Sequence, residues 1–144
     1  METKFLKGVW AILYILDIKF YKKQGIVYAI VSLCTLIFGL IYEMFSHNVV
    51  SNYMIFAFVI PLTIGAIVSI IMYKLKIKKL TRAQINLYNA SIATLTVWSI
   101  IKGILEIYGT TNWKVNIYLV VSILLLFGSL VVNKVAKKKP GYNL

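Results

Sequence analysis

The chain has 144 residues, of which 60% are hydrophobic, and its mean hydropathy is +0.84. A soluble domain of this size could not bury so much apolar surface, so the composition excludes a soluble globular protein and predicts one membrane domain. The formal net charge is +12, but the cations gather in short segments between apolar stretches. Such segments barely supply the folded basic surface that phosphate contacts need, and we expect no nucleic-acid partner.

The first predicted element is a helix over residues 3–23. Its apolar run, residues 9–16, is too short to span a bilayer, and Asp17 interrupts it. Three lysines of this segment share one helical sector, and aromatic residues typical of headgroup depth accompany them. We therefore expect an amphipathic interfacial helix on the cytoplasmic leaflet, with Gln24 and Gly25 making the turn into the membrane.

Four apolar stretches follow, each long enough to cross a bilayer as a helix. Pro61 lies within the second stretch and predicts a kink, because proline removes one backbone hydrogen bond. Thr81 is a candidate cap for a helix that runs into the third stretch. The fold class expected is an all-α membrane protein with four transmembrane helices in a left-handed bundle. The predicted spans are residues 26–45, 53–73, 87–108 and 115–133, and a tail over residues 134–144 follows.

The distribution of cations predicts how the chain is oriented. Fourteen of the sixteen Lys and Arg residues lie in the N-terminal segment, in the loop between the second and third spans, and in the tail. The two other loops carry only Lys114, and Lys102 lies within a span. Because Lys and Arg are enriched in cytoplasmic segments, both termini are expected to face the cytoplasm and the two short loops to face outside.

Lys102 and Glu106 lie inside the third span, one helical turn apart on the same face. A lysine at mid-membrane costs roughly 2.5–3.5 kcal/mol on insertion scales, so it usually has a partner and often a function. Glu106 is the expected partner of Lys102. Glu43 is expected as a second partner, because Lys followed by Glu is the less favourable order for an isolated pair. A structural ion pair, a ligand or transport site, and catalysis are the three interpretations left open.

Further polar and aromatic groups are expected around this pair, near the outer ends of the first and third spans. Trp98 and Ser99 share a broad helical face with Lys102, and His47 and Asn52 lie in the loop after the first span. The sequence thus predicts an outward-facing polar pocket. Its predicted residues are Lys102, Glu106, Glu43, His47, Asn52, Trp98 and Ser99.

Signatures of catalysis are absent from the sequence. It contains no HExxH, GxSxG or Walker motif and no DxxD-type pair of carboxylates. Cys34 is the only cysteine and His47 the only histidine, which excludes an intramolecular disulfide, a CxxC redox pair and bis-histidine haem ligation. We expect no enzymatic activity, no metal and no cofactor.

Within residues 46–112, four short motifs stand out: NYM (52–54), PL (61–62), IATLTV (92–97) and EIYGTT (106–111). With these motifs the chain resembles a family of small four-span bacterial membrane proteins of no assigned function. The resemblance implies a bacterial plasma membrane and carries no activity. Small multidrug-resistance transporters share the length and the four spans, but they depend on a carboxylate in the middle of the first span. This chain has none there, since Glu43 lies near the end of that span.

Two non-enzymatic functions follow as hypotheses. The first is the binding or transport of a small solute at the outward-facing pocket. The alternative is an accessory or immunity-type subunit that binds another membrane protein through its helix faces. The expected partners are the lipid bilayer and either a second copy of the chain or another membrane protein. Transport favours an oligomer, because four spans enclose little volume.

Overall fold

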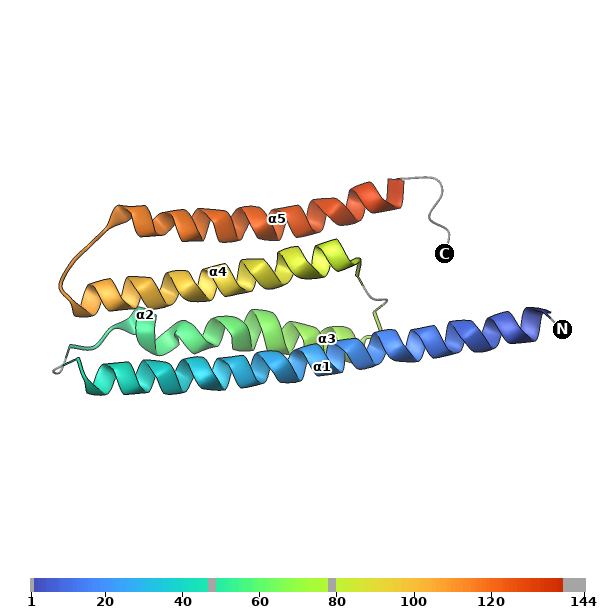
Figure 1. Cartoon of the computed structure of the whole chain (residues 1–144), viewed down its shortest axis with the longest axis horizontal. Helices are drawn as coiled ribbons and strands as arrows, with labels where there is room; N and C mark the ends of the chain where they lie inside the picture. The colour runs from blue at the N-terminus through green and yellow to red at the C-terminus, as the bar shows by residue number, and fades with distance from the viewer. Residues whose placement is uncertain (1, 47–48, 78–79, 139–144) are drawn as a thin grey trace.

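The computed structural model describes residues 2–46, 49–77 and 80–138, with side chains described between residues 19 and 132. Within these ranges all regular secondary structure is helical, as Figure 1 shows. Four stretches are long and apolar enough to cross a membrane, which confirms the all-helical class and four helices of spanning length. These stretches are Lys19–Met44, Asn52–Lys74, Arg82–Ile107 and Trp113–Val132.

The helices follow the predicted spans in order. The first span belongs to α1 (Glu2–Met44), the third to α4 (Arg82–Ile107), and the fourth to the short turn η3 (Trp113–Val115) with α5 (Asn116–Lys138). The second span is divided into four pieces, which are α2 (Asn52–Ile55), the 3₁₀ turn η1 (Phe56–Phe58), the π-helical stretch η2 (Pro61–Ile67) and α3 (Val68–Lys74).

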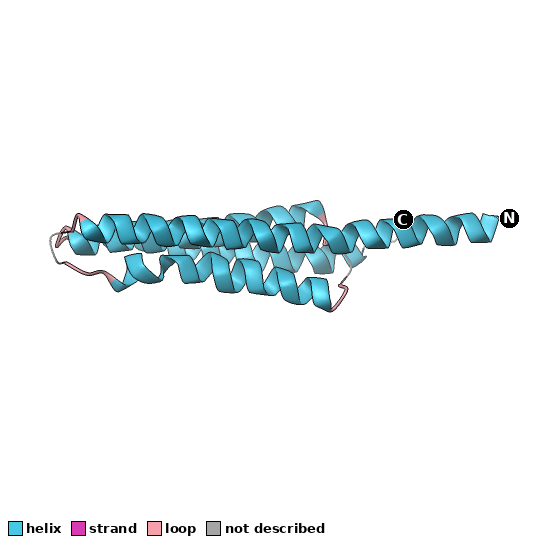
Figure 2. Cartoon of the chain, turned by 90° about the horizontal axis from the view of Figure 1, so that it is seen from below, coloured by secondary structure: helices cyan, strands magenta, loops and turns pink. Residues whose placement is uncertain are grey.

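The helix α1 is continuous, so the predicted turn at Gln24 and Gly25 is wrong, and residues 3–23 do not form a separate helix. At 1.5 Å per residue its 43 residues measure about 64 Å, roughly twice the hydrocarbon thickness of a bilayer. The N-terminal half therefore projects in line with the first span, well beyond the other helices (Figures 1 and 2). Gly25 is buried against α3, where an added Cβ would lie 3.2 Å from Ile70 Cγ1. It is a packing residue and not a turn residue.

The second span is irregular around Pro61, as the sequence predicts. The backbone changes from the 3₁₀ geometry of η1 to the wide turns of η2, which begins at this proline. Side chains of the same helix and of both neighbours hydrogen-bond to carbonyl groups around the break. Ser32 donates to Phe58 (2.9 Å), Thr63 to Val59 (2.7 Å) and Tyr88 to Ile64. The irregular backbone is thus stabilised by polar groups inside an otherwise apolar layer.

The helices pack side by side in chain order (Figure 1). α1 packs against the pieces of the second span, the second span packs against α4, and α4 makes its most extensive contact with α5. Small polar residues join α4 to α5 through reciprocal hydrogen bonds. Ser91 and Ser122 each donate to the other's carbonyl oxygen (2.8 and 3.1 Å), and Gln84 and Ser129 do the same (3.3 and 3.1 Å). These pairs repeat every seven residues on both helices, so one face of α4 is committed to α5.

Both ends of α4 are capped. Thr81 forms a capping box with Gln84, which confirms its predicted role and starts the helix at Arg82. At the other end Gly109 adopts φ +66° and donates to the Glu106 carbonyl at 3.0 Å, while Thr110 donates to the Leu105 carbonyl at 2.9 Å. This Schellman-type ending places Glu106 in the last turn of α4.

Candidate functional site

The first turn of α2 lies between α1 and α4 because both neighbours present a glycine to it. Met54 is 1% exposed. A Cβ added at Gly39 on α1 would lie 3.1 Å from the Met54 carbonyl oxygen, and one added at Gly103 on α4 would lie 2.8 Å from the Met54 backbone nitrogen. The missing side chains thus bring three spans together at the end opposite the basic loop, on the left of Figure 1.

Ser51, fully buried just before α2, holds two carboxylates that come from different spans. Its backbone N–H donates to Glu43 Oε1 at 2.9 Å, and its hydroxyl donates to Glu106 Oε2 at 2.5 Å. The loop itself is closed by Ser46, whose hydroxyl oxygen lies 2.7 Å from the Glu43 carbonyl oxygen and 2.6 Å from that of Val49. One serine therefore links the end of α1 to the end of α4.

Tyr53, two residues after Ser51, is contacted by three of the predicted residues of α4. Ser99 donates to the Tyr53 carbonyl at 2.8 Å, and the Trp98 ring packs edge-on against the Tyr53 ring with centroids 5.8 Å apart. The ammonium of Lys102 lies 5.9 Å from the centroid of the same ring, at the outer limit of a cation–π contact. Trp98 Nε1 also faces the Asn116 Oδ1 of α5 at 3.5 Å.

The expected ion pair between Lys102 and Glu106 is not formed among the described side chains. Glu106 is instead hydrogen-bonded to Ser51, and Lys102 lies over Tyr53. Glu43, expected as the second partner of Lys102, is bonded to Ser51 as well. The physical reason is that α2 begins between α1 and α4, which places Ser51 within hydrogen-bonding distance of both carboxylates and the Tyr53 ring near Lys102.

The remaining predicted residues are placed as follows. Asn52, the first residue of α2, is exposed and lies between Ser51 and Tyr53 in the chain. His47 lies outside the described residues. The structure thus brings six of the seven predicted positions to one end of the molecule, arranged around two residues that the sequence reasoning did not single out. Of these two, Ser51 had a detectable signal, since serine is a preferred residue immediately before a helix.

Two carboxylates meet at this end of the molecule. Glu43 lies in the last turn of α1 and Glu106 in the last turn of α4, where the helix dipoles already place partial negative charge. Lys102 and the exposed Lys114 lie at the same end, but Lys102 is directed to an aromatic ring and not to a carboxylate. Two carboxylates at two helix C-termini favour a cation at this surface.

A hollow of about 370 Å³ lies between the same ends of α1 and α4, although neither Glu43 nor Glu106 lines it. The side chains that line it come from the ends of α1 and α4, and all but one of them are aromatic or apolar. They are Tyr42, Phe45, Ser46, Ile107 and Tyr108. Tyr42 directly precedes Glu43 in the chain, and Ile107 directly follows Glu106. A hollow with aromatic walls, at the same helix ends as two carboxylates, has the chemistry to hold a small organic cation.

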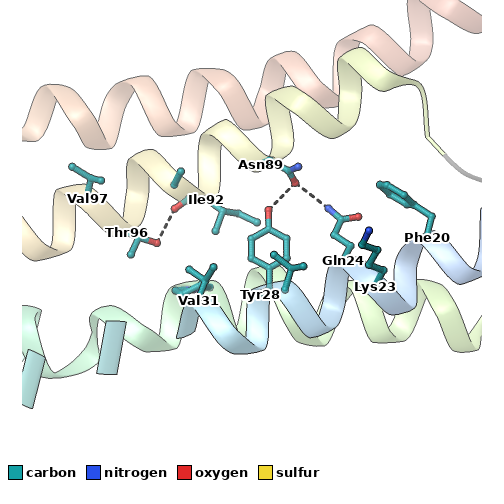
Figure 3. Close-up of a pocket in the computed structure, with 12 residues that line it drawn as sticks. Phe20, Lys23, Gln24, Tyr28, Val31, Asn89, Ile92, Thr96 and Val97 are labelled. Carbon is teal, nitrogen blue, oxygen red and sulfur yellow. Dashed lines mark hydrogen bonds between the residues drawn. The ribbon is translucent and has the colours of Figure 1, made fainter. Parts of the chain in front are cut away.

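A second hollow lies toward the basic end, between α1 and α4 (Figure 3). We call it the α1/α4 groove. It measures about 620 Å³, and the sequence reasoning did not identify it. Polar groups meet at one end of it, where Asn89 Oδ1 accepts hydrogen bonds from Gln24 Nε2 at 2.9 Å and from the Tyr28 hydroxyl at 2.7 Å.

Within the part of the chain that the structure describes, no three of the metal-ligating residue types His, Cys, Asp and Glu come together. Comparisons of the chain with protein-family models, with curated proteins and with solved structures found no match. The chemistry of the two hollows is therefore the basis for assigning a function.

Proposed function

We propose that this protein is a non-enzymatic, multi-pass protein of a bacterial plasma membrane that binds a small organic cation at its outer end, for uptake or export. The observation that carries the proposal is the convergence of Glu43 and Glu106 on Ser51, beside the aromatic hollow. The four apolar helices and the basic segments at one end support insertion with both termini in the cytoplasm. In that orientation Glu43 and Glu106 lie at the outer face of the membrane.

A cation is favoured over an anion or a neutral solute for two reasons. Both carboxylates lie at helix C-termini, and the aromatic side chains Tyr42 and Tyr108 line the adjacent hollow. Glu106 is exposed and Glu43 is half-buried, so a ligand can reach both without unpacking the helices. Asn52 is exposed and lies between Ser51 and Tyr53 in the chain, where it is placed to contact a polar part of the same ligand.

The proposal is tested by titrating the purified protein in detergent with tetraethylammonium, choline and 3,3-dimethyl-1-butanol, using calorimetry. The last compound has the shape of choline without its charge. We expect both cations to bind and the neutral compound to bind at least ten-fold more weakly. Glu43→Gln and Glu106→Gln should each weaken cation binding roughly five-fold, as expected for the loss of about 1 kcal/mol of partly screened attraction.

The matched control is Asp17→Asn, which also removes one negative charge from α1, but from its N-terminal half, far along the helix from Glu43. This variant should bind both cations like the unaltered protein. Circular dichroism and size-exclusion chromatography establish that each variant is folded. Equal binding of choline and its neutral analogue, or an equal loss in Asp17→Asn, would contradict the proposal.

The alternative function, an accessory or immunity-type subunit, is favoured by a different observation. α5 packs mainly on α4 and exposes large apolar side chains along its length, Leu124, Phe127 and Leu130 among them at 60–64%. Such a face suits lipid, a second copy of the chain or another membrane protein. Absence of cation binding, together with a stoichiometric membrane protein that co-purifies in mild detergent, would favour this function.

A further inference from the structure

The α1/α4 groove is polar at one end only. Its walls are apolar, with Val27 and Val31 on α1 and Ala93 and Val97 on α4. The hydroxyl of Thr96, which also lines the groove, donates to the Ile92 carbonyl of its own helix at 2.8 Å (Figure 3). The middle of the groove therefore offers no free hydrogen-bonding group to a ligand. A ligand that fills it must be apolar over most of its length.

The polar end of the groove has hydrogen-bond donors that have no partner among the described residues. The Asn89 side-chain oxygen accepts two hydrogen bonds, but its NH₂ group has no partner among the described residues. Lys23 also lines this end, and Figure 3 shows its ammonium turned toward α4 beside Gln24. No described carboxylate forms an ion pair with Lys23, since Glu43 and Glu106 lie at the far end of the molecule. An ammonium and an amide donor without partners match an anionic group.

The position of the groove identifies the kind of molecule. From Lys23 to Val31 on α1, and from Asn89 to Val97 on α4, the groove runs for about 12 Å at 1.5 Å per residue. This length is less than half of the roughly 30 Å hydrocarbon core, so the groove belongs to a single leaflet. Its polar end lies with the basic residues that flank the spans, including the exposed Lys74 and Arg82. Anionic lipids concentrate at such basic membrane-flanking segments.

We propose that the α1/α4 groove binds one anionic phospholipid from the leaflet at the basic end of the molecule. The lipid phosphate contacts Lys23 and the NH₂ group of Asn89, and one acyl chain lies along Val27, Val31 and Val97. A second copy of the chain fits this site less well, because a packed helix needs contact along most of its length and the groove covers only about two helical turns. This binding site is independent of the cation site at the opposite end.

The test is native mass spectrometry of the protein in detergent, titrated with phosphatidylglycerol and phosphatidylcholine that carry identical acyl chains. We expect one phosphatidylglycerol per chain, bound roughly five-fold more tightly than phosphatidylcholine, which corresponds to about 1 kcal/mol for one lysine. Lys23→Gln should reduce phosphatidylglycerol binding to the level of phosphatidylcholine. Ala93→Phe, which fills the groove, should weaken the binding of both lipids at least five-fold.

Two control variants lie on the opposite side of α1. Lys22 and Ala29 are exposed and, at 100° per residue, point away from the groove. Lys22→Gln and Ala29→Phe should change lipid binding less than two-fold. The proposal is overturned if the two lipids bind equally, or if Lys22→Gln weakens binding as much as Lys23→Gln. It is also overturned if Ala93→Phe leaves lipid binding intact and instead converts a dimer into a monomer, since a second copy would then occupy the groove.

Discussion

Between Ser99 and Glu106, α4 touches the second span at backbone distance, whereas between Asn89 and Val97 it stands away from α1 and leaves a groove. The close half has a glycine, a serine and a carboxylate directed at the first turn of α2 and the loop before it. The open half is joined to α1 by hydrogen bonds to Asn89. One helix therefore combines a close contact and an open one along the same 26 residues.

This difference shows how four helices of spanning length can combine a close helix contact with an open groove. Apolar burial does not discriminate between helix contact and lipid contact, because lipid tails are as apolar as leucine. Close contact therefore depends on small residues and on hydrogen bonds, which the C-terminal half of α4 supplies. Where bulkier side chains such as Ile92 and Val97 face α1, the helices separate and a ligand can occupy the space.

The largest expected effect concerns the closest contact. Gly103→Ala places a Cβ 2.8 Å from the Met54 nitrogen and 3.0 Å from its Cα, so α2 or α4 must shift. Overpacking of this kind costs about 1–3 kcal/mol, and the better helix propensity of alanine recovers up to about 1 kcal/mol. We expect a net loss of about 2 kcal/mol in the free energy of unfolding, measured by titration with sodium dodecyl sulfate and followed by circular dichroism.

Gly128→Ala on α5 is the matched control, because the nearest atom to its added Cβ, Leu87 Cδ1, lies at 3.8 Å. This variant should be as stable as the unaltered protein or slightly more stable. If both alanine variants behave alike, the C-terminal half of α4 is not closely packed, and the contrast between the two halves fails.

The next effect identifies the partner of Glu106. In a double-mutant cycle, Ser51→Ala and Glu106→Ala should show a coupling energy of about 1 kcal/mol, because the Ser51 hydroxyl donates to the carboxylate at 2.5 Å. The cycle of Lys102→Met with Glu106→Ala should show less than about 0.5 kcal/mol, the size of an i, i+4 pair on a helix. Both coupling energies are measured by the same unfolding titration. A larger coupling for Lys102 than for Ser51 would restore the ion pair and remove the two-carboxylate site.

The sequence predicts those parts of the structure that depend on local chemistry. The length of the apolar stretches is sufficient to locate four helices. Thr81 locates the start of α4, and Pro61 locates the irregular part of the second span. Each of these features is determined by residues that lie within a few positions of one another. For the same reason the carboxylates Glu43 and Glu106 could be assigned to one end of the molecule.

Contacts between residues that lie far apart in the chain could not be predicted from local sequence patterns. Ser51 meets Glu106 across 55 positions, and Gln24 meets Asn89 across 65. The first contact depends on the small residues that admit α2 between its neighbours, and the second on the distance at which α1 and α4 stand apart. The predicted turn at Gln24 failed because hydrophobicity locates the limits of an apolar run, whereas helix continuity depends on the backbone, which nothing in that segment interrupts.

The smallest expected effect tests the open half of α4. Tyr28→Phe removes the hydroxyl that donates to Asn89 Oδ1 at 2.7 Å, while the ring keeps its place over Gly65. Hydrogen bonds between membrane helices average about 0.6 kcal/mol, and Asn89 keeps its bond from Gln24, so the loss of stability should be close to that value.

The control is Tyr118→Phe on α5, since the Tyr118 side chain is 43% exposed and its hydroxyl has no hydrogen bond within the described part of the chain. Tyr118→Phe should leave the unfolding titration unchanged. If Tyr28→Phe cost as much as Gly103→Ala, α1 and α4 would be joined as firmly at the groove as α2 and α4 are at Gly103, and a lipid would have no room to enter between them.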